Sequence, residues 1–142
     1  MTDVWFAGGM VADGSGTDPV EVDVCVSGGI VTAIGQAPSG STTVDLDGML
    51  LTPGLIDAHV HLGISSPIRR QFGFELSAAE LAAGIFATAG DALDAGFTTV
   101  RDVGGIDGGV VDVIASGKVR GPRVLSCGPV QCQTGGHGYY GA

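Results

Sequence analysis

One nine-residue segment constrains this chain more than any other: Pro53-Gly-Leu-Ile-Asp-Ala-His-Val-His61. Leu55 to Val60 is an almost continuous apolar run interrupted only by Asp57 and His59, which is typical of a β-strand covered on both faces. Side chains two residues apart share one face of a strand, so Asp57, His59 and His61 are predicted to point the same way. The fold must therefore present two imidazoles together at the end of one strand.

This pair of imidazoles predicts a metal site. The two side chains are separated by roughly 6–7 Å along such a strand, so both can lean onto one ion beyond its end. Neutral imidazole nitrogen is a good ligand for zinc and related divalent metals. Asp57, one pleat deeper, could orient a ring or approach the metal from behind the ligands. The alternative is that each histidine is a hydrogen-bonded core or surface residue, because the His-x-His spacing is common. The apolar strand, the Pro-Gly turn and the aligned Asp57 favour the metal.

Residues 1–52, which precede this segment, show short strands and turns. Gly8-Gly9 predicts a two-residue hairpin, Gly28-Gly29 predicts a second turn between strands, and Asp47-Gly48 predicts a third. Valines alternate with other residues over 21–26, as in a half-buried strand. The predicted strands are 4–7, 10–12, 21–26, 30–34, 43–46 and 49–52. Residues 1–52 are therefore expected to form a small all-β unit.

From residue 53 onward, strands alternate with helices. Ser77-Ala-Ala-Glu80 is a capping box that begins a helix, and Gly96 is expected to end it. The next predicted elements are a strand over 98–103, a short helix over 110–115 that ends at Gly117, and a strand over 123–126. This order predicts parallel β/α units with right-handed crossovers, so that all three strand ends lie on one side.

Composition excludes several classes of protein. Hydrophobic residues make up 44% and charged residues 15%, which excludes disorder. A net charge of −9 argues against nucleic acid or an anionic membrane as a partner. The N-terminus lacks the pattern of a signal peptide, and no apolar run approaches the ~20 residues that span a bilayer. The three cysteines, Cys25, Cys127 and Cys132, are too few for a disulfide scaffold and favour the cytoplasm.

The segment 53–61 resembles the first barrel strand of the amidohydrolase superfamily. Three further stretches narrow the resemblance to the branch of imidazolonepropionase-like hydrolases and bacterial Xaa-Pro dipeptidases. They are Ala95-Gly-Phe-Thr-Thr-Val-Arg-Asp-Val-Gly-Gly105, Gly121-Pro-Arg-Val-Leu-Ser126 and Thr134-Gly-Gly-His-Gly138. The resemblance covers essentially the whole chain. It implies an α/β fold in which residues 53–142 are the start of a (β/α)₈ TIM barrel, about three β/α units. Residues 1–52 would be the N-terminal part of a small β-sandwich.

The resemblance also implies chemistry. His59 and His61 would be ligands of a divalent metal, zinc foremost, with one or two ions in the centre. The remaining ligands in such enzymes, often a carboxylated Lys, two His and an Asp, come from later strands, and no catalytic residue is assigned within this chain. A metal-activated water would hydrolyse an amide C–N bond in a small peptide or a cyclic amide.

Three residues in or after the later strands are further candidates for a role at the site. His137 follows the third strand on a Gly-rich loop, and it is predicted to contact substrate; the alternative is an exposed loop histidine. Asp102 ends the second strand, where it could point into the barrel mouth and support the site from behind the ligands, or only cap the strand. Arg101 has the opposite face and could pair with an acidic neighbour.

Chain length leaves other functions open. A (β/α)₈ barrel needs about 250 residues, so the 142 residues alone are expected to lack hydrolase activity. One alternative is a non-catalytic remnant or partner subunit that works by association. Another is a deacetylase or cyclic-ureide hydrolase with the same opening motif. The expected partner is a small-molecule amide or dipeptide substrate, and a homo-oligomer is left open.

Overall fold

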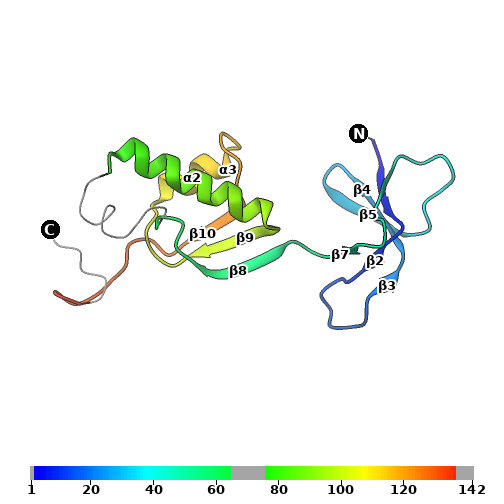
Figure 1. Ribbon diagram of the computed structural model, residues 1–142, viewed down its shortest axis with the longest axis horizontal. Helices are drawn as coiled ribbons and strands as arrows, with labels where there is room; N and C mark the ends of the chain where they lie inside the picture. Colours follow the sequence, from blue (N-terminus) through cyan, green and yellow to red (C-terminus); the bar gives the residue numbers. More distant parts are fainter. Residues whose placement is uncertain (1, 65–75, 137–142) are drawn as a thin grey trace. The chain divides into compact units, whose positions relative to one another are not determined.

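The chain has a mixed α/β fold with two compact units, Met1–Pro53 and Gly54–Ala142. The computed structural model, shown in Figure 1, describes residues 2–64 and 76–136. The N-terminal unit contains strands only, and the described helices belong to the C-terminal unit.

The N-terminal unit consists of two sheets. A four-stranded sheet has the order β5-β4-β1-β6, and a three-stranded sheet has the order β3-β2-β7. The strands are β1 (Val4–Ala7), β2 (Met10–Val11), β3 (Val20–Glu21), β4 (Asp23–Ser27), β5 (Ile30–Gly35), β6 (Thr43–Asp45) and β7 (Leu50–Leu51). The prediction of a small all-β unit is confirmed.

Two of the three predicted turns do not join paired strands. β1 pairs with β4 and β6, whereas β2 pairs with β3 and β7, so the hairpin predicted at Gly8-Gly9 is wrong. The pairing predicted around Asp47-Gly48 is wrong for the same reason, because β6 and β7 lie in different sheets. The two segments instead run in parallel and pass together from one sheet to the other. Their backbones bond to each other there, with the Gly48 N–H donating to the Gly8 carbonyl at 2.9 Å.

The hairpin at Gly28-Gly29 is confirmed. β4 and β5 are antiparallel, with Ser27 opposite Ile30. The alternation predicted over 21–26 is only partly correct, because the neighbours Val24 and Cys25 are both buried. The pairing with β5 also shifts register between Cys25 and Val26.

The C-terminal unit is a three-stranded parallel sheet of order β10-β9-β8 with two helices. The elements are β8 (Leu55–Val60), α2 (Ala78–Asp94), β9 (Phe97–Asp102), α3 (Gly108–Ala115) and β10 (Arg123–Ser126). This confirms the predicted alternation of strands and helices, and both helices lie against the same face of the sheet (Figure 1). The buried core between the layers consists of Leu62, Ile85, Ala89, Val100, Ile106, Ile114 and Val124.

The helix ends follow the local sequence. The Ser77 hydroxyl accepts a hydrogen bond from the Glu80 N–H at 3.2 Å, and a Glu80 carboxylate oxygen accepts one from the Ser77 N–H at 3.0 Å. The predicted capping box is therefore present. After α2 the chain turns at Gly96, whose φ of 92° favours glycine. Among the described residues, no helix is both long and apolar enough to cross a membrane.

Removing the cap should weaken this helix measurably. Ser77→Ala leaves early amide groups of α2 without their acceptor, and we expect it to lower the free energy of unfolding by about 1 kcal/mol. Ser77→Thr keeps a hydroxyl at the same position and serves as the control. Urea denaturation followed by circular dichroism at 222 nm compares them. Equal midpoints for the alanine and threonine variants would contradict the prediction.

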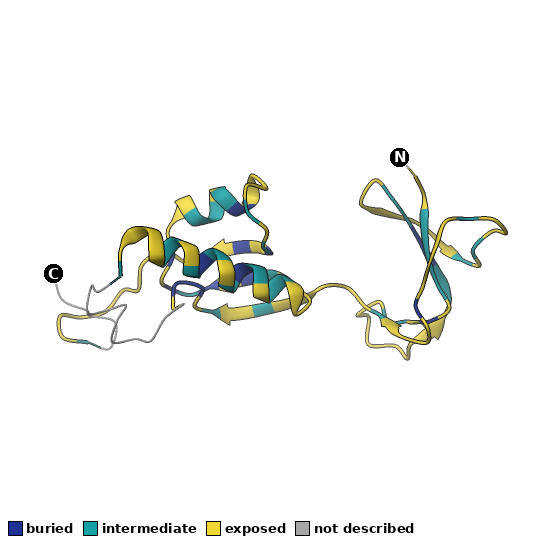
Figure 2. Cartoon of the chain, turned by 45° about the horizontal axis from the view of Figure 1, so that its top comes forward, coloured by how far each residue is buried: buried dark blue, intermediate teal, exposed yellow. Residues whose placement is uncertain are grey.

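The strand that carries the histidines is less covered than its sequence suggests. β8 is an edge strand, and Ile56 is 71% exposed. Figure 2 shows much of β8 as exposed, whereas buried residues lie between the sheet and the helices. The prediction of a strand covered on both faces is therefore wrong for this chain. Within residues 2–64 and 76–136, one face of β8 has a packing layer, and Val60 contacts the core on that side.

Candidate metal centre

The two histidines lie side by side at the end of β8. The ring centroids of His59 and His61 are 5.5 Å apart, with an angle of 73° between the ring planes. Both side chains belong to exposed residues, so an ion could reach them from solvent. The rings are thus neighbours, as the alternation along the strand predicts.

A bulge in β8 contributes to this placement. Asp57 lies opposite Val100 and Val60 lies opposite Asp102, so three steps along β8 match two steps along β9. The extra residue falls between Asp57 and Val60, in the stretch that contains His59, and bulges commonly redirect a side chain. The sequence alone does not indicate this irregularity.

His61 is held by a backbone carbonyl. Its Nδ1 lies 2.8 Å from the carbonyl oxygen of Gly104, in the loop that follows β9. A carbonyl oxygen can only accept a hydrogen bond, so Nδ1 must carry the hydrogen in this contact. The lone pair of the neutral ring is then on Nε2, the nitrogen left to bind a metal.

The pair fits a zinc-type ion. Two imidazoles that share one tetrahedral zinc have ring centroids roughly 5 Å apart, given Zn–N distances of about 2.0–2.1 Å. The observed 5.5 Å is close to that separation. Within 2–64 and 76–136, however, no group of three or more His, Cys, Asp or Glu side chains is arranged to hold a metal. The described residues therefore place two imidazoles side by side, with no third potential ligand from the described chain arranged around them.

Asp57 does not contact either ring through the bonds that the structure records. Its Oδ1 accepts a hydrogen bond from the backbone N–H of His59 at 2.9 Å. This bond restrains the backbone of His59. Gly104, and not Asp57, is the residue bonded to an imidazole.

Asp102 lies beneath the loops that follow β8 and β9. It is fully buried, at 0% exposure, and each carboxylate oxygen accepts a backbone N–H. Oδ2 accepts from Leu62 at 2.7 Å and Oδ1 accepts from Gly104 at 2.9 Å. The sequence left open whether Asp102 supports the site or only caps the strand, and its recorded partners are these two amides. Its carboxylate ties the loop after β8 to the loop after β9.

Arg101 also bonds to backbone. Its Nε donates to the carbonyl of Ala58 at 2.8 Å, in the irregular part of β8. The acidic neighbour expected from the sequence is not the recorded partner. The guanidinium instead satisfies a carbonyl beside the bulge.

Sequence reasoning missed the glycines that bring the loops together. Gly63 and Gly105 approach so closely that a Cβ built on Gly63 would lie 2.5 Å from the Gly105 carbonyl carbon. The Gly104-Gly105 pair after a strand was visible as a signal, but glycine pairs suit many loops. Its partners lie about forty residues earlier in the chain, beyond the reach of a local pattern.

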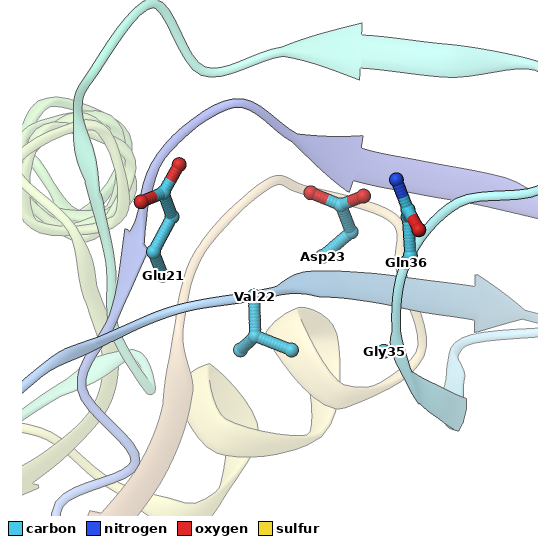
Figure 3. Close-up of a pocket in the computed structure, with 5 residues that line it drawn as sticks. All are labelled: Glu21, Val22, Asp23, Gly35 and Gln36. Carbon is cyan, nitrogen blue, oxygen red and sulfur yellow. The ribbon is translucent and has the colours of Figure 1, made fainter.

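A hollow lies in the N-terminal unit. It has a volume of about 360 Å³ and is lined by Glu21, Val22, Asp23, Gly35 and Gln36. Figure 3 shows the carboxyl groups of Glu21 and Asp23 on one side of the strand and Val22 on the other. The Asp23 carboxylate already accepts N–H groups from Ala37 at 2.8 Å and Gly8 at 3.4 Å. This arrangement supports the loops around β4.

His137, predicted to contact substrate, lies outside the described residues.

Comparisons with known proteins point in one direction. The model of the amidohydrolase family matches residues 50–131, more than half of the chain. A dihydroorotase from Citrifermentans bemidjiense is 45% identical over 58 residues, which cover 39% of this chain and 14% of that protein.

Two solved structures match over more of the chain. A prolidase complexed with N-methylphosphonate-L-proline superposes with a TM-score of 0.82 and 29% identity, covering 96% of this chain and 34% of that one. A Xaa-Pro dipeptidase with methionine bound in its active site gives a TM-score of 0.79 and 29% identity, covering 96% and 36%. The chain thus spans about a third of these structures and a smaller part of the dihydroorotase.

Proposed function

We propose, since the chain belongs to the amidohydrolase family, that His59 and His61 are two ligands of a divalent metal centre that hydrolyses an amide C–N bond. The observation that carries the proposal is the pair of rings 5.5 Å apart, with Nδ1 of His61 bonded to the Gly104 carbonyl. That bond leaves Nε2 available as a ligand nitrogen. Zinc is the metal that suits these donors best, in a centre of one or two ions.

Each residue of the site has a defined task in this function. When bound, such a metal supplies an activated water and polarises the scissile carbonyl. His59 and His61 hold it at the end of β8, Gly104 keeps one ring oriented, and Asp57 steadies the backbone of His59. No described residue is assigned as the proton donor to the leaving nitrogen.

The proposed fold of the complete site is a (β/α)₈ barrel. Residues 53–142 would be its first part, about three β/α units, and residues 1–52 would be part of a small β-sandwich. The parallel order β10-β9-β8 and the TM-scores near 0.8 support this assignment. The further strands of such a barrel would cover the open face of the sheet and supply the remaining ligands.

The substrate we propose is a small peptide or a cyclic amide. The match to the prolidase and the Xaa-Pro dipeptidase extends over 96% of the chain and favours a dipeptide. The higher identity to the dihydroorotase, confined to 39% of the chain, favours a cyclic amide as the second candidate. His137 is the proposed substrate contact in either case. A role as a non-catalytic partner subunit is the remaining alternative.

Metal content after substitution of both ligands tests the proposal. We expect the protein carrying His59→Ala and His61→Ala to lose its bound metal, because both imidazole donors of this half of the centre are gone. Elemental analysis after zinc loading and gel filtration measures the loss. His137→Ala, at the chain's third histidine, is the matched control and should keep its metal.

The outcomes separate the alternatives. Unchanged metal content in the double variant would remove the central claim. Metal that is lost in the double variant and kept in the control supports a centre at the end of β8.

A further inference from the structure

We propose that Asp102 is a positioning residue that sets the tautomer of His61 through the Gly104 peptide. The inference rests on the proposed function only where it concerns metal binding. The hydrogen bonds themselves are properties of the protein without metal.

The Asp102 carboxylate lies in a buried, hydrogen-bonded environment. Asp102 is fully buried, and burying a charge is costly unless strong hydrogen bonds compensate. Its two oxygens receive the N–H groups of Leu62 and Gly104 at 2.7 and 2.9 Å. Hydrogen bonds to an ionised acceptor are about twice as strong as those between neutral groups. Both peptides are therefore held firmly.

The Leu62 and Gly104 peptides flank His61. Leu62 follows His61 directly in the chain, and the carbonyl of Gly104 accepts the hydrogen of His61 Nδ1 at 2.8 Å. The contacts form a closed circuit from Asp102 to Leu62 to His61, then through Gly104 back to Asp102. One carboxylate thus restrains His61 in two ways: through the Leu62 peptide next to it in the chain, and through the Gly104 peptide that is bonded to its Nδ1.

Gly104 links the Asp102 carboxylate to the His61 ring. Its N–H is bonded to Asp102 and its C=O to His61, so the position of one group constrains the other. Its φ of 148° is a conformation that favours glycine. The residue therefore turns the carbonyl towards the ring while its amide stays on the carboxylate.

These contacts fix the tautomer of His61 before any metal binds. With Nδ1 bonded to a carbonyl, the neutral ring of His61 keeps its lone pair on Nε2. Partners behind a ligand that fix ring orientation typically change metal affinity 10–100-fold when they are lost. Asp102 would act on a metal in this way without touching it.

The variant that tests this is Asp102→Asn. An asparagine has the same shape but only one oxygen acceptor, and its amide NH₂ cannot accept a peptide N–H. One of the two bonds must fail, and the circuit around His61 opens. Asp107→Asn is the matched control, because Asp107 accepts the Val110 N–H at 3.2 Å at the start of α3 and lies outside the circuit.

The readout is the tautomer of His61 in the metal-free protein. Long-range ¹H–¹⁵N spectra of the imidazoles, recorded well above an ordinary histidine pKa of about 6.5, distinguish Nδ1–H from Nε2–H. We expect the Nδ1–H form in the wild type and in Asp107→Asn, and a mixture of both tautomers in Asp102→Asn. The zinc dissociation constant should rise about 10–100-fold in Asp102→Asn alone.

Two results would overturn the inference: an Nε2–H tautomer at His61 in the wild type, or an unchanged tautomer in folded Asp102→Asn. If that variant does not fold, couplings across the hydrogen bonds from Leu62 and Gly104 to the Asp102 carboxyl group decide the matter in the wild type. Their absence rejects the circuit, and their presence together with the Nδ1–H tautomer supports it. A His59 and His61 double variant that keeps its metal rejects the proposed function and leaves the tautomer result standing.

Discussion

Replacing Gly63 with alanine is expected to destabilise the C-terminal unit severely. Gly63 is buried, and a Cβ there would overlap the carbonyl group of Gly105, lying 2.5 Å from its carbon and 2.8 Å from its Cα. The obstructing atoms are backbone, so no side-chain rotation relieves the overlap. The loops after β8 and β9 would have to separate, which strains both Asp102 bonds. We expect a loss of more than about 3 kcal/mol in the free energy of unfolding.

The measurement can be confined to this unit. The described helices, α2 and α3, both belong to it, so circular dichroism at 222 nm during urea denaturation follows its unfolding. Gly108→Ala is the matched control, because a Cβ at Gly108 meets no atom within 4 Å. Gly108 begins α3, where alanine is the better helix former, so its midpoint should stay the same or rise slightly. If Gly63→Ala unfolded within about 0.5 kcal/mol of the wild type, the close approach would be refuted.

Replacing Gly9 with alanine should have a comparable effect on the N-terminal unit. Gly9 is buried where the chain passes from one sheet to the other, and its added Cβ would overlap the Met49 carbonyl oxygen. The same atom would lie 2.8 Å from the Leu46 Cβ. These contacts belong to the parallel segment that crosses alongside. We expect a loss of about 3 kcal/mol or more, because both crossing segments must move apart.

Trp5 provides a specific probe for this second prediction. It is the chain's one tryptophan and lies in β1, so its fluorescence during denaturation reports on the N-terminal unit. Gly40→Ala is the control, since a Cβ there meets nothing within 4 Å while the φ of 82° still disfavours alanine. That control should lose about 1–2 kcal/mol from conformation alone. Gly9→Ala and Gly40→Ala unfolding at the same urea concentration would contradict the proposed crossing.

Local patterns in the sequence predicted most of the C-terminal unit. The capping box at Ser77, the helical spacing that follows and the turn at Gly96 depend on residues within a few positions of one another. The strands over 55–60 and 123–126 depend on short apolar runs between turn residues. Each element could therefore be located without knowledge of its neighbours. The proximity of His59 and His61 was predicted from their two-residue spacing, whereas the irregularity in β8 was not.

Long-range contacts were beyond such patterns. Gly8-Gly9 has the composition of a hairpin turn, yet its backbone bonds to a segment forty residues away. Asp102 could be recognised as the end of a strand, but its acceptance of the Leu62 and Gly104 amides depends on how two loops meet. The exposure of β8 depends on its place at the edge of the sheet.

The sequence by itself determined which residues form strands and helices and that two imidazoles share a strand end, because periodicity and capping act over a few residues. Only the tertiary structure decided how the imidazoles are held. Gly104 must reach His61 across 43 positions of the chain. Hydrogen bonds between distant peptides depend on the register of parallel strands and on loops close enough to touch, and a local pattern encodes neither.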